Sequence, residues 1–255
     1  MSRYDLTDSE WRVISLLLPN MPRGVPRVDD RRVLNGILWV LRSGAPWRDL
    51  PERYGPRTTC YNRFVRWRRA GVWDRLMDAI IAAYDGDIQM IDSTSIRAHQ
   101  QAATAKRGGR DHCLGRSRGG LTTKIHGLVD RQGLPPRLSL SAGQAHDAPA
   151  VLTLLDRLDP RTIVLADKAY DGDVIRDLME AYGAVPNIPA KSNRKWKPCF
   201  SKSLYSERNQ VERFFRKLKH FRRIATRYQK LADNFLVVVK LASCRLWLRA
   251  YESTA

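Results

Sequence analysis

The chain has 255 residues and is poor in acidic residues and in long apolar stretches. It holds 26 Asp and Glu against 45 Lys and Arg, which gives a formal net charge of +19. A protein this basic meets a polyanion, most often a nucleic acid, and an anionic membrane surface is the alternative. Because no run of about 18 apolar residues is present, the sequence contains no candidate transmembrane helix, and we expect no membrane contact.

Cysteine is also scarce. The four cysteines are widely spaced and form no Cys-x-x-Cys pair: Cys60, Cys113, Cys199 and Cys244. This spacing disfavours a zinc site, and free thiols are typical of the reducing cytosol. The N-terminus, "MSRYDLTDSEW", lacks the features of a signal peptide, so we expect a cytoplasmic protein.

Residues 1–85 have the pattern of a small helical domain. Thr7 and Glu10 have capping-box spacing, and Gly44 and Gly71 are placed to end helices. The helix predicted in "RTTCYNRFVRWRRAG" is basic and includes Arg63 and Arg66. A turn followed by a basic helix is typical of helix-turn-helix DNA readers, although a solvated basic face has the same pattern.

The pattern changes after Gly86. Three predicted strands are followed by helix, strand, helix, strand and two further helices, the order of a mixed α/β sheet of the ribonuclease-H type. We therefore expect a second domain over residues 86–255, with basic C-terminal helices. Residues 191–230 alone contain 14 Lys and Arg against two acids.

Two aspartates stand where apolar runs end. Asp92 follows "IQMI" and Asp167 follows "IVLA", so we place both at strand ends. Each could simply cap the turn that follows it. Ligands of open α/β sheets, however, bind at the carboxyl ends of strands, and paired carboxylates suit a hard divalent cation. The pattern favours a metal site.

The segment "YSERNQVERFFRKLK" contains two glutamates. Treated as one helix, it places four side chains on a stripe about 60° wide: Tyr205, Arg208, Glu212 and Lys219. Glu207 falls near the opposite side. An ordinary i,i+4 ion pair between Arg208 and Glu212 accounts for part of this pattern. The pattern also suits a metal-binding acid flanked by cations that neutralise a phosphodiester.

The same segment matches the Tyr-x2-Arg-x3-Glu-x6-Lys signature, and the chain resembles bacterial DDE transposases of insertion-sequence family five. "IDSTSIRAH" and "LADKAYDGD" resemble the segments of the first two catalytic acids, and "RSGAPWRDLPERYGPRTTCYNRFVRW" resembles the N-terminal helical domain. Ala169 stands where family members often carry Gly. The resemblance covers nearly the whole chain.

The resemblance implies a ribonuclease-H-like catalytic core, with an N-terminal all-α helix-turn-helix-like domain. It implies that Asp92, Asp167 and Glu212 are catalytic and hold two Mg²⁺ ions, for which Mn²⁺ could substitute. Arg208 and Lys219 would contact the DNA backbone. Tyr205 would contact a phosphate or a base.

Three further residues are considered as DNA contacts. Lys168 and Tyr170, beside Asp167, are candidate DNA contacts or solvated turn residues. Trp196 could stack on a base, but we expect it to be partly buried.

The implied function is that of a transposase. It would bind terminal inverted repeats, cut there and join the ends to target DNA, as a homodimer or larger assembly. The alternatives are a metal-dependent DNA nuclease of the same fold, a non-catalytic DNA-binding regulator derived from a transposase, and an intact but silent copy.

Overall fold

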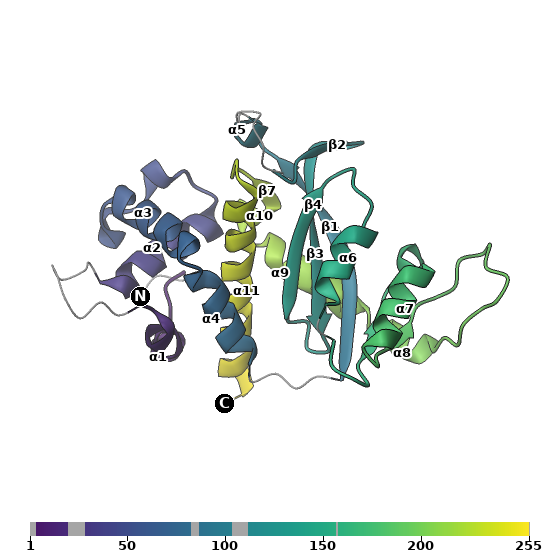
Figure 1. Ribbon diagram of the computed structural model, residues 1–255. Helices are drawn as coiled ribbons and strands as arrows, with labels where there is room; N and C mark the ends of the chain where they lie inside the picture. Colours follow the sequence, from purple (N-terminus) through teal and green to yellow (C-terminus); the bar gives the residue numbers. More distant parts are fainter. Residues whose placement is uncertain (1–3, 20–28, 83–86, 104–111, 157, 255) are drawn as a thin grey trace. The chain divides into compact units, whose positions relative to one another are not determined.

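The computed structural model describes residues 4–19, 29–82, 87–103, 112–156 and 158–254. The chain divides into two compact units, one from residues 1–83 and 218–255 and the other from residues 84–217. Their helices and strands are labelled in Figure 1. Each unit buries its own set of apolar side chains.

The first unit is almost entirely helical. Its elements are α1 (Asp8–Leu17), α2 (Asp30–Ser43), η1 (Trp47–Asp49), η2 (Glu52–Tyr54), α3 (Arg57–Arg69), α4 (Val72–Ile81), α10 (Arg222–Ala225), β7 (Thr226–Arg227) and α11 (Ala232–Thr254). In the part of the chain that the structure describes, no helix has the length and apolar character needed to span a lipid bilayer.

The helix ends follow the local sequence. The Thr7 side chain accepts a hydrogen bond from the Glu10 backbone N–H at 3.0 Å, and the Glu10 carboxylate accepts one from the Thr7 N–H at 2.8 Å, so the predicted capping box is confirmed. α2 ends at Gly44, whose φ is +78°, and Gly71, with φ +64°, separates α3 from α4. Both glycines adopt the left-handed conformation that other residues rarely take.

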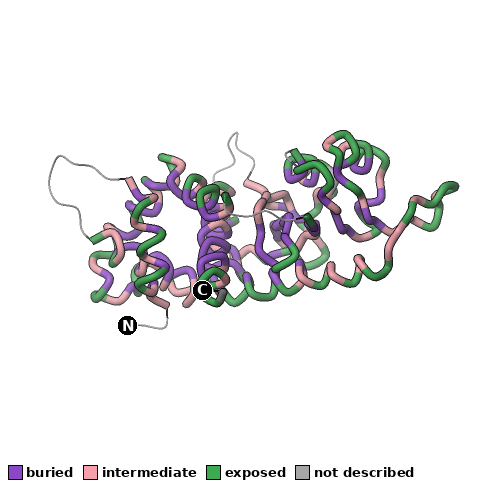
Figure 2. The backbone as a smooth tube through the Cα atoms, turned by 90° about the horizontal axis from the view of Figure 1, so that it is seen from below, coloured by how far each residue is buried: buried purple, intermediate pink, exposed green. Residues whose placement is uncertain are grey.

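The closing helix α11 belongs to the helical unit. It packs against α1, α2, α3, α4 and α10, and buried residues follow most of its length. Figure 2 shows the buried parts of the backbone in purple. We expected one C-terminal domain over residues 86–255, whereas the structure groups residues 218–255 with the N-terminal helices. A helix that is apolar on most sides must be surrounded, and the short amphipathic N-terminal helices surround it.

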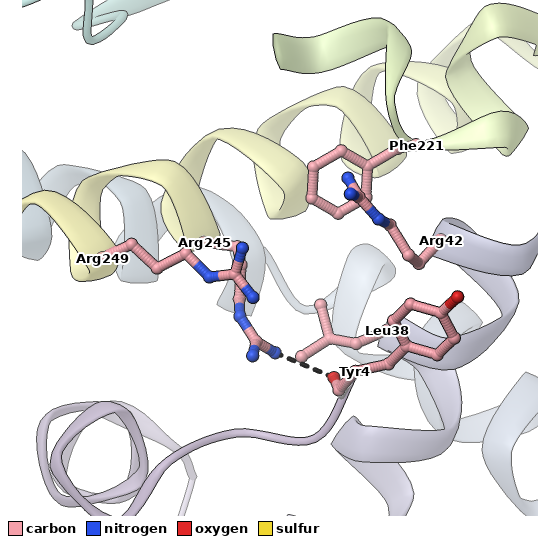
Figure 3. Close-up of a pocket in the computed structure, with 6 residues that line it drawn as sticks. All are labelled: Tyr4, Leu38, Arg42, Phe221, Arg245 and Arg249. Atoms are coloured by element: carbon pink, nitrogen blue, oxygen red, sulfur yellow. Dashed lines mark hydrogen bonds between the residues drawn. The ribbon is translucent and has the colours of Figure 1, made fainter. Parts of the chain in front are cut away.

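A buried ion pair ties the start of the chain to α11. Arg245 Nε lies 2.8 Å from Glu10 Oε1, and both side chains are buried. Arg245 also donates to the backbone oxygens of Tyr4, at 3.0 Å (Figure 3), and Asp5, at 2.6 Å. Figure 3 shows Arg245 beside a cavity of about 60 Å³, on which Arg249 also borders. Removal of Arg245 would leave the buried Glu10 carboxylate with only the Thr7 N–H at 2.8 Å and the more distant Arg249 at 3.9 Å.

The second unit is an α/β sheet. Its elements are β1 (Ile88–Ala98), α5 (Gln100–Ala103), β2 (Gly115–Ser117), β3 (Gly120–Asp130), β4 (Arg137–Ala142), α6 (Ala148–Leu154), β5 (Ile163–Leu165), η3 (Lys168–Tyr170), α7 (Asp173–Ala181), β6 (Val185–Asn187), α8 (Lys202–Ser206) and α9 (Asn209–Lys219).

The strand order confirms the predicted sheet. β1 pairs antiparallel with β3, and β3 pairs antiparallel with β4 and β2. On its other edge β1 pairs in parallel with β5, which pairs in parallel with β6. Three antiparallel strands followed by two parallel ones give the order β4-β3-β1-β5-β6, which is the ribonuclease-H type of sheet.

The register of β1 and β3 decides which helix each residue faces. Ile91 is paired with Leu128, and both belong to a buried cluster with side chains of α6 and α7. Asp92 and Gly127 form the next pair and point to the opposite face. A Cβ atom on Gly127 would lie 3.4 Å from the ring of Phe215 in α9. Thus α6 and α7 cover one face of the sheet and α9 covers the other (Figure 1).

A buried carboxyl group closes the turn between β3 and β4. Asp130 is fully buried and accepts the backbone N–H of Leu134 at 2.7 Å. Its second oxygen has no hydrogen-bond partner, and neither has Gln89 Oε1, although the two residues are directly paired on β1 and β3. Burial raises the pKa of Asp130 to about 6.

We predict that Asp130 makes the fold less stable as pH rises. Since its folded pKa of about 6 exceeds the ordinary value of 3.8, the folded state binds the proton more tightly than the unfolded state. The stabilisation is therefore complete below pH 4 and is lost as pH rises through 6, a change of about 3 kcal/mol. Asp130→Asn should remove this loss.

The measurement is urea unfolding of wild type and Asp130→Asn between pH 4 and pH 7.5. The difference in unfolding free energy between the two proteins should grow with pH in favour of the variant. Asp177→Asn, an exposed carboxyl on α7, is the matched control and should follow the wild-type curve. A difference independent of pH would show that Asp130 is ionised throughout.

Candidate active site

Asp92 and Asp167 occupy matched places on two parallel strands. β1 and β5 pair in register up to Met90 and Leu165. Asp92 and Asp167 each follow two residues later, and Asp167 keeps an extended backbone (φ −79°, ψ 172°). Both therefore point to the face of the sheet that α9 covers, and neighbouring strands lie only about 4.8 Å apart. The register makes the two carboxyl groups neighbours.

The predicted strand ends are right for one aspartate and wrong for the other. Asp167 follows the end of β5 as predicted. Asp92 lies inside β1, because antiparallel pairing with β3 continues to Arg97 and Thr122 after β5 has stopped. Asp92 therefore marks the point where β1 stops pairing with β5, and β1 itself continues beyond it.

Both aspartates also make the local contacts expected of turn-capping residues. Asp92 Oδ1 accepts the backbone N–H of Ser93 at 2.7 Å, and Asp167 Oδ1 accepts that of Ala169 at 2.8 Å. The other oxygen of Asp92, Oδ2, lies 2.7 Å from Arg208 Nη1. Turn capping and metal binding are thus compatible for these residues, because one carboxylate oxygen accepts the backbone N–H and the other faces the site.

Arg208 joins Asp92 to the glutamate of α9. Its Nη2 lies 3.2 Å from Glu212 Oε1, one turn along the chain. Its guanidinium also lies over the ring of Tyr205, with Cζ 5.7 Å from the ring centre. The structure therefore brings Asp92, Arg208, Glu212 and Tyr205 together.

The single helix predicted over residues 205–219 is wrong. α8 ends at Ser206 and α9 begins at Asn209, with a turn at Glu207 and Arg208 between them. Tyr205 and Glu212 thus stand on different helices and meet through Arg208 rather than through helical spacing. Glu207 points elsewhere, with Oε2 3.0 Å from Arg131 Nε. The helical wheel that separated Glu207 from Glu212 is therefore wrong, and the exclusion of Glu207 from the site stays a prediction.

The site has the electrostatics of clustered acids. Burial is the largest effect and raises the pKa of Asp92; the charge of Asp167 raises it further. The Ser93 N–H and the Arg208 guanidinium both lower it. A half-buried carboxylate beside a second one is stabilised in its ionised form by a nearby cation, and Arg208 is that cation in this structure.

The residues suit a divalent metal. Within the described ranges, no three His, Cys, Asp or Glu side chains are gathered closely enough to hold an ion. Yet a positive group, the Arg208 guanidinium, already lies between carboxylates of β1 and α9. The donors around it are carboxylate oxygens, which hard divalent ions prefer. The donor set and the position of Arg208 therefore fit a divalent cation.

Comparison with sequence families gives the class of protein. Residues 83–247 match the family described as "Transposase DDE domain", and residues 6–77 match "Putative transposase of IS4/5 family". The chain belongs to the DDE transposase family. This is a family of enzymes that cleave DNA and transfer its strands. The family and the enzyme class inferred from the sequence motifs are therefore confirmed.

Individual relatives agree. A putative transposase for insertion sequence element IS6501 from Brucella ovis is 40% identical over 130 residues, which cover 51% of this chain and 100% of that protein. An uncharacterized 16.2 kDa protein of insertion element IS402 from Burkholderia cepacia is 38% identical over 113 residues, 38% of this chain and 76% of that protein.

Among solved structures, a piggyBac transposase in a synaptic complex with hairpin DNA matches with a TM-score of 0.51 at 12% identity. The match covers 96% of this chain and 71% of that one. It confirms the ribonuclease-H-like fold.

The two arginines that were predicted to contact DNA from the basic helix of this DDE transposase differ in exposure. Arg63 is only 8% exposed, and its guanidinium pairs with Asp30 and lies over Trp67, with Cζ 5.2 Å from the ring centre. It is an internal residue rather than a surface contact, because it faces the inner side of α3. Arg66 is exposed, so contact with DNA stays a prediction for it.

The other candidate DNA contacts near the acids also differ in exposure. Lys168, next to Asp167, is exposed, and so is Lys219 at the last position of α9, about 10 Å along the helix from Glu212. Tyr170 is buried in the cluster beneath α6 and α7, so the prediction that it contacts DNA is wrong.

The expectation that Trp196 is partly buried is wrong as well. Its side chain is 73% exposed, on the loop between β6 and α8. Arg194 holds that loop through Asp171 at 2.8 Å and Asp173 at 2.6 Å. No local pattern distinguishes an exposed Trp from a buried one, because burial depends on what the loop packs against.

We predict that Arg208 sets the ionisation of Asp92. Arg208→Gln removes the positive charge 2.7 Å from the Asp92 carboxylate, so the pKa of Asp92 should rise above its wild-type value. NMR titration of ¹³C-labelled aspartate carboxyl groups measures this pKa. Arg131→Gln, which removes the matched arginine bound to Glu207, is the control. An unchanged Asp92 titration in Arg208→Gln would contradict the ion pair.

Proposed function

We propose that this DDE transposase serves an insertion sequence: it binds the terminal inverted repeats of its element, cleaves DNA at the ends and joins them to target DNA. The proposal is supported above all by the neighbouring positions of Asp92 and Asp167 and by the link from Asp92 to Glu212 through Arg208. These are the three acids that the family resemblance implies.

In this proposal Asp92, Asp167 and Glu212 hold two Mg²⁺ ions, for which Mn²⁺ substitutes. When bound, the ions activate the attacking water or 3′-hydroxyl and stabilise the leaving oxygen. The Ser93 and Ala169 N–H groups keep one oxygen of each aspartate in place. Glu212 is more accessible than Asp92, since its side chain is 45% exposed against 21% for Asp92.

Arg208 has two partners in this scheme. Without metal it neutralises Asp92 and Glu212. A bound metal would neutralise the same carboxylates, and the Arg208 guanidinium, a planar bidentate donor, would then suit a DNA phosphate beside them. Tyr205, under the guanidinium, keeps it oriented through a cation–π contact or contacts the DNA itself.

The remaining DNA contacts would come from exposed cations. Lys168 and Lys219 flank the acids in sequence, and Arg66 lies on the exposed side of α3 in the helical unit, which would read the inverted repeats. Cutting two ends together requires at least two active sites, so we propose a homodimer or larger assembly on DNA.

We predict that Glu212, and not Glu207, is required for cleavage. The assay uses purified protein, a labelled duplex carrying the end of its own element, and Mg²⁺. Glu212→Gln should lower cleavage and strand joining by at least about 100-fold, because losing a metal ligand removes several kcal/mol of transition-state stabilisation. Glu207→Gln, five residues earlier, should cut and join like wild type. Both variants should still bind the duplex.

Each alternative function has its own outcome in this assay. Cleavage without strand joining would indicate a nuclease. Tight DNA binding that survives EDTA, with no cleavage by any of the three proteins, would indicate a DNA-binding regulator. Loss of cleavage in Glu207→Gln alone would overturn the proposed metal site.

A further inference from the structure

The strand pairing that makes Asp92 and Asp167 neighbours stops before it reaches them. β1 and β5 are paired only as far as Met90 and Leu165. Beyond that point Asp92 is paired with Gly127 of β3, and Asp167 is the N-cap of η3. The separation of the two carboxyl groups therefore depends on further contacts of the two segments that carry them.

Asp147 contacts the first of these segments from the other face of the sheet. It is the N-cap of α6, where an aspartate ordinarily accepts a backbone N–H of the helix, but its side chain makes no capping hydrogen bond. Instead, Asp147 Oδ1 accepts a hydrogen bond from Lys124 Nζ of β3 at 2.8 Å, and Oδ2 accepts one from Ser93 Oγ of β1 at 3.4 Å. Lys124 also donates to the backbone oxygen of Ala145 at 2.8 Å. One carboxylate thus joins β1, β3 and the start of α6.

Ser93 connects Asp147 to the first acid. Its backbone N–H donates to Asp92 Oδ1 at 2.7 Å. Its side chain turns to the opposite face of the sheet, because successive side chains of a strand alternate. Ser93 therefore holds the Asp92 carboxylate with its backbone and Asp147 with its hydroxyl. Any displacement of Ser93 would move the Asp92 carboxylate with it.

Tyr170 approaches Asp147 from the segment of the second acid. Its backbone N–H donates to the Asp167 backbone oxygen at 3.1 Å. Within the described ranges, its hydroxyl is buried and makes no hydrogen bond of normal geometry. Burial raises the pKa of Tyr170, and the charges of Asp147 and Asp92 raise it further. The nearby Ser93 hydroxyl lowers this pKa. The Tyr170 hydroxyl thus lies among groups from both acid-bearing segments.

A short chain of hydroxyl groups would pair the Tyr170 oxygen. Ser93 Oγ donates its proton to Asp147, and its lone pairs can accept a proton from Tyr170 Oη. This chain runs from the segment of Asp167, through β1, to the start of α6. Its charged end is partly shielded from solvent, since the side chains of Asp147 and Lys124 are 25% and 19% exposed.

We propose that Asp147 is a positioning residue for the metal-binding acids: it fixes the separation of the segments that carry Asp92 and Asp167. It acts through Ser93 on one side and Tyr170 on the other. This role presupposes the proposed function, in which Asp92 and Asp167 hold divalent ions. Two ions about 3.5 to 4 Å apart require a defined spacing of their carboxylate ligands. Residues that hold such ligands in place raise the affinity for metal.

The test measures Mn²⁺ binding directly, so that the result does not depend on cleavage. The full chain is titrated with Mn²⁺ in the absence of DNA, and the free ion is quantified from its EPR signal. Asp147→Asn keeps the size of the side chain and removes the charge that binds Lys124. Asp156→Asn is the matched control, because Asp156 lies just beyond the other end of α6 and pairs with Arg137 of β4 at 2.7 Å.

A second pair of variants tests the hydroxyl chain. Tyr170→Phe removes only the buried hydroxyl, and Tyr182→Phe is its control, because Tyr182 packs against the same buried cluster. Asp147→Asn should weaken Mn²⁺ binding by about 10- to 100-fold. Tyr170→Phe should weaken it by roughly 2- to 12-fold, the range for one hydrogen bond. Both controls should bind like wild type.

The double variant shows whether the two residues act together. Because Asp147 and Tyr170 act through the shared Ser93 hydroxyl, the combined loss in Mn²⁺ affinity should be smaller than the product of the two single losses. A combined loss equal to that product would contradict a shared chain.

Metal dependence of cleavage separates positioning from misfolding. Asp147→Asn retains all three acids, so raising Mg²⁺ by about 100-fold should restore its cleavage of the element-end duplex. The same increase should not restore Glu212→Gln, which lacks a ligand. The metal-free Tm of Asp147→Asn should stay close to that of Asp156→Asn, since each variant loses one partly exposed ion pair.

The outcomes distinguish this role from the metal site itself. If wild type binds Mn²⁺, Glu212→Gln does not, and Asp147→Asn binds as tightly as wild type, the positioning role is overturned and the metal site stands. An equal loss of affinity in Asp156→Asn would also overturn it, because any weakening of the sheet unit would then have the same effect. If wild type binds no Mn²⁺, the proposed metal site fails and the positioning role fails with it.

Discussion

The acidic site depends on the parallel pairing of β1 with β5. This pairing sets Met90 opposite Leu165, and alternation along each strand then turns Asp92 and Asp167 to the same face. A shift of one residue in either strand would send one carboxylate into the apolar cluster beneath α6 and α7. Register is strongly determined here because that cluster must be filled by the residues that alternate with the acids.

The second constraint is charge. Two neighbouring carboxylates repel each other, and burial further disfavours their ionised form. Arg208 offsets both effects from the turn that precedes α9, and its bond to Glu212 brings the third acid to the same point. A single arginine therefore holds Asp92 and Glu212 together. It lies where a divalent cation could bind the same carboxylate oxygens.

The helical unit is organised by a different principle. Its central feature is α11, whose apolar sides are covered by helices from the start of the chain. Docking the C-terminal segment against α3 also creates a cavity lined in part by aromatic side chains, because Tyr61 and Gln229 are brought together from segments more than 160 residues apart in the sequence. The acidic site and the cavity thus use separate parts of the chain, and each can be altered without touching residues of the other.

The sequence by itself determined the features whose signals lie within a few residues. These include the capping box at Thr7, the helix end at Gly44 and the order of the main strands of the sheet. Only the tertiary structure decided that Asp92 lies inside a strand, since that follows from its pairing with β3. It also decided that Arg63 is internal and Trp196 exposed. Burial and strand length depend on partners distant in the sequence, and no local pattern of residues contains that information.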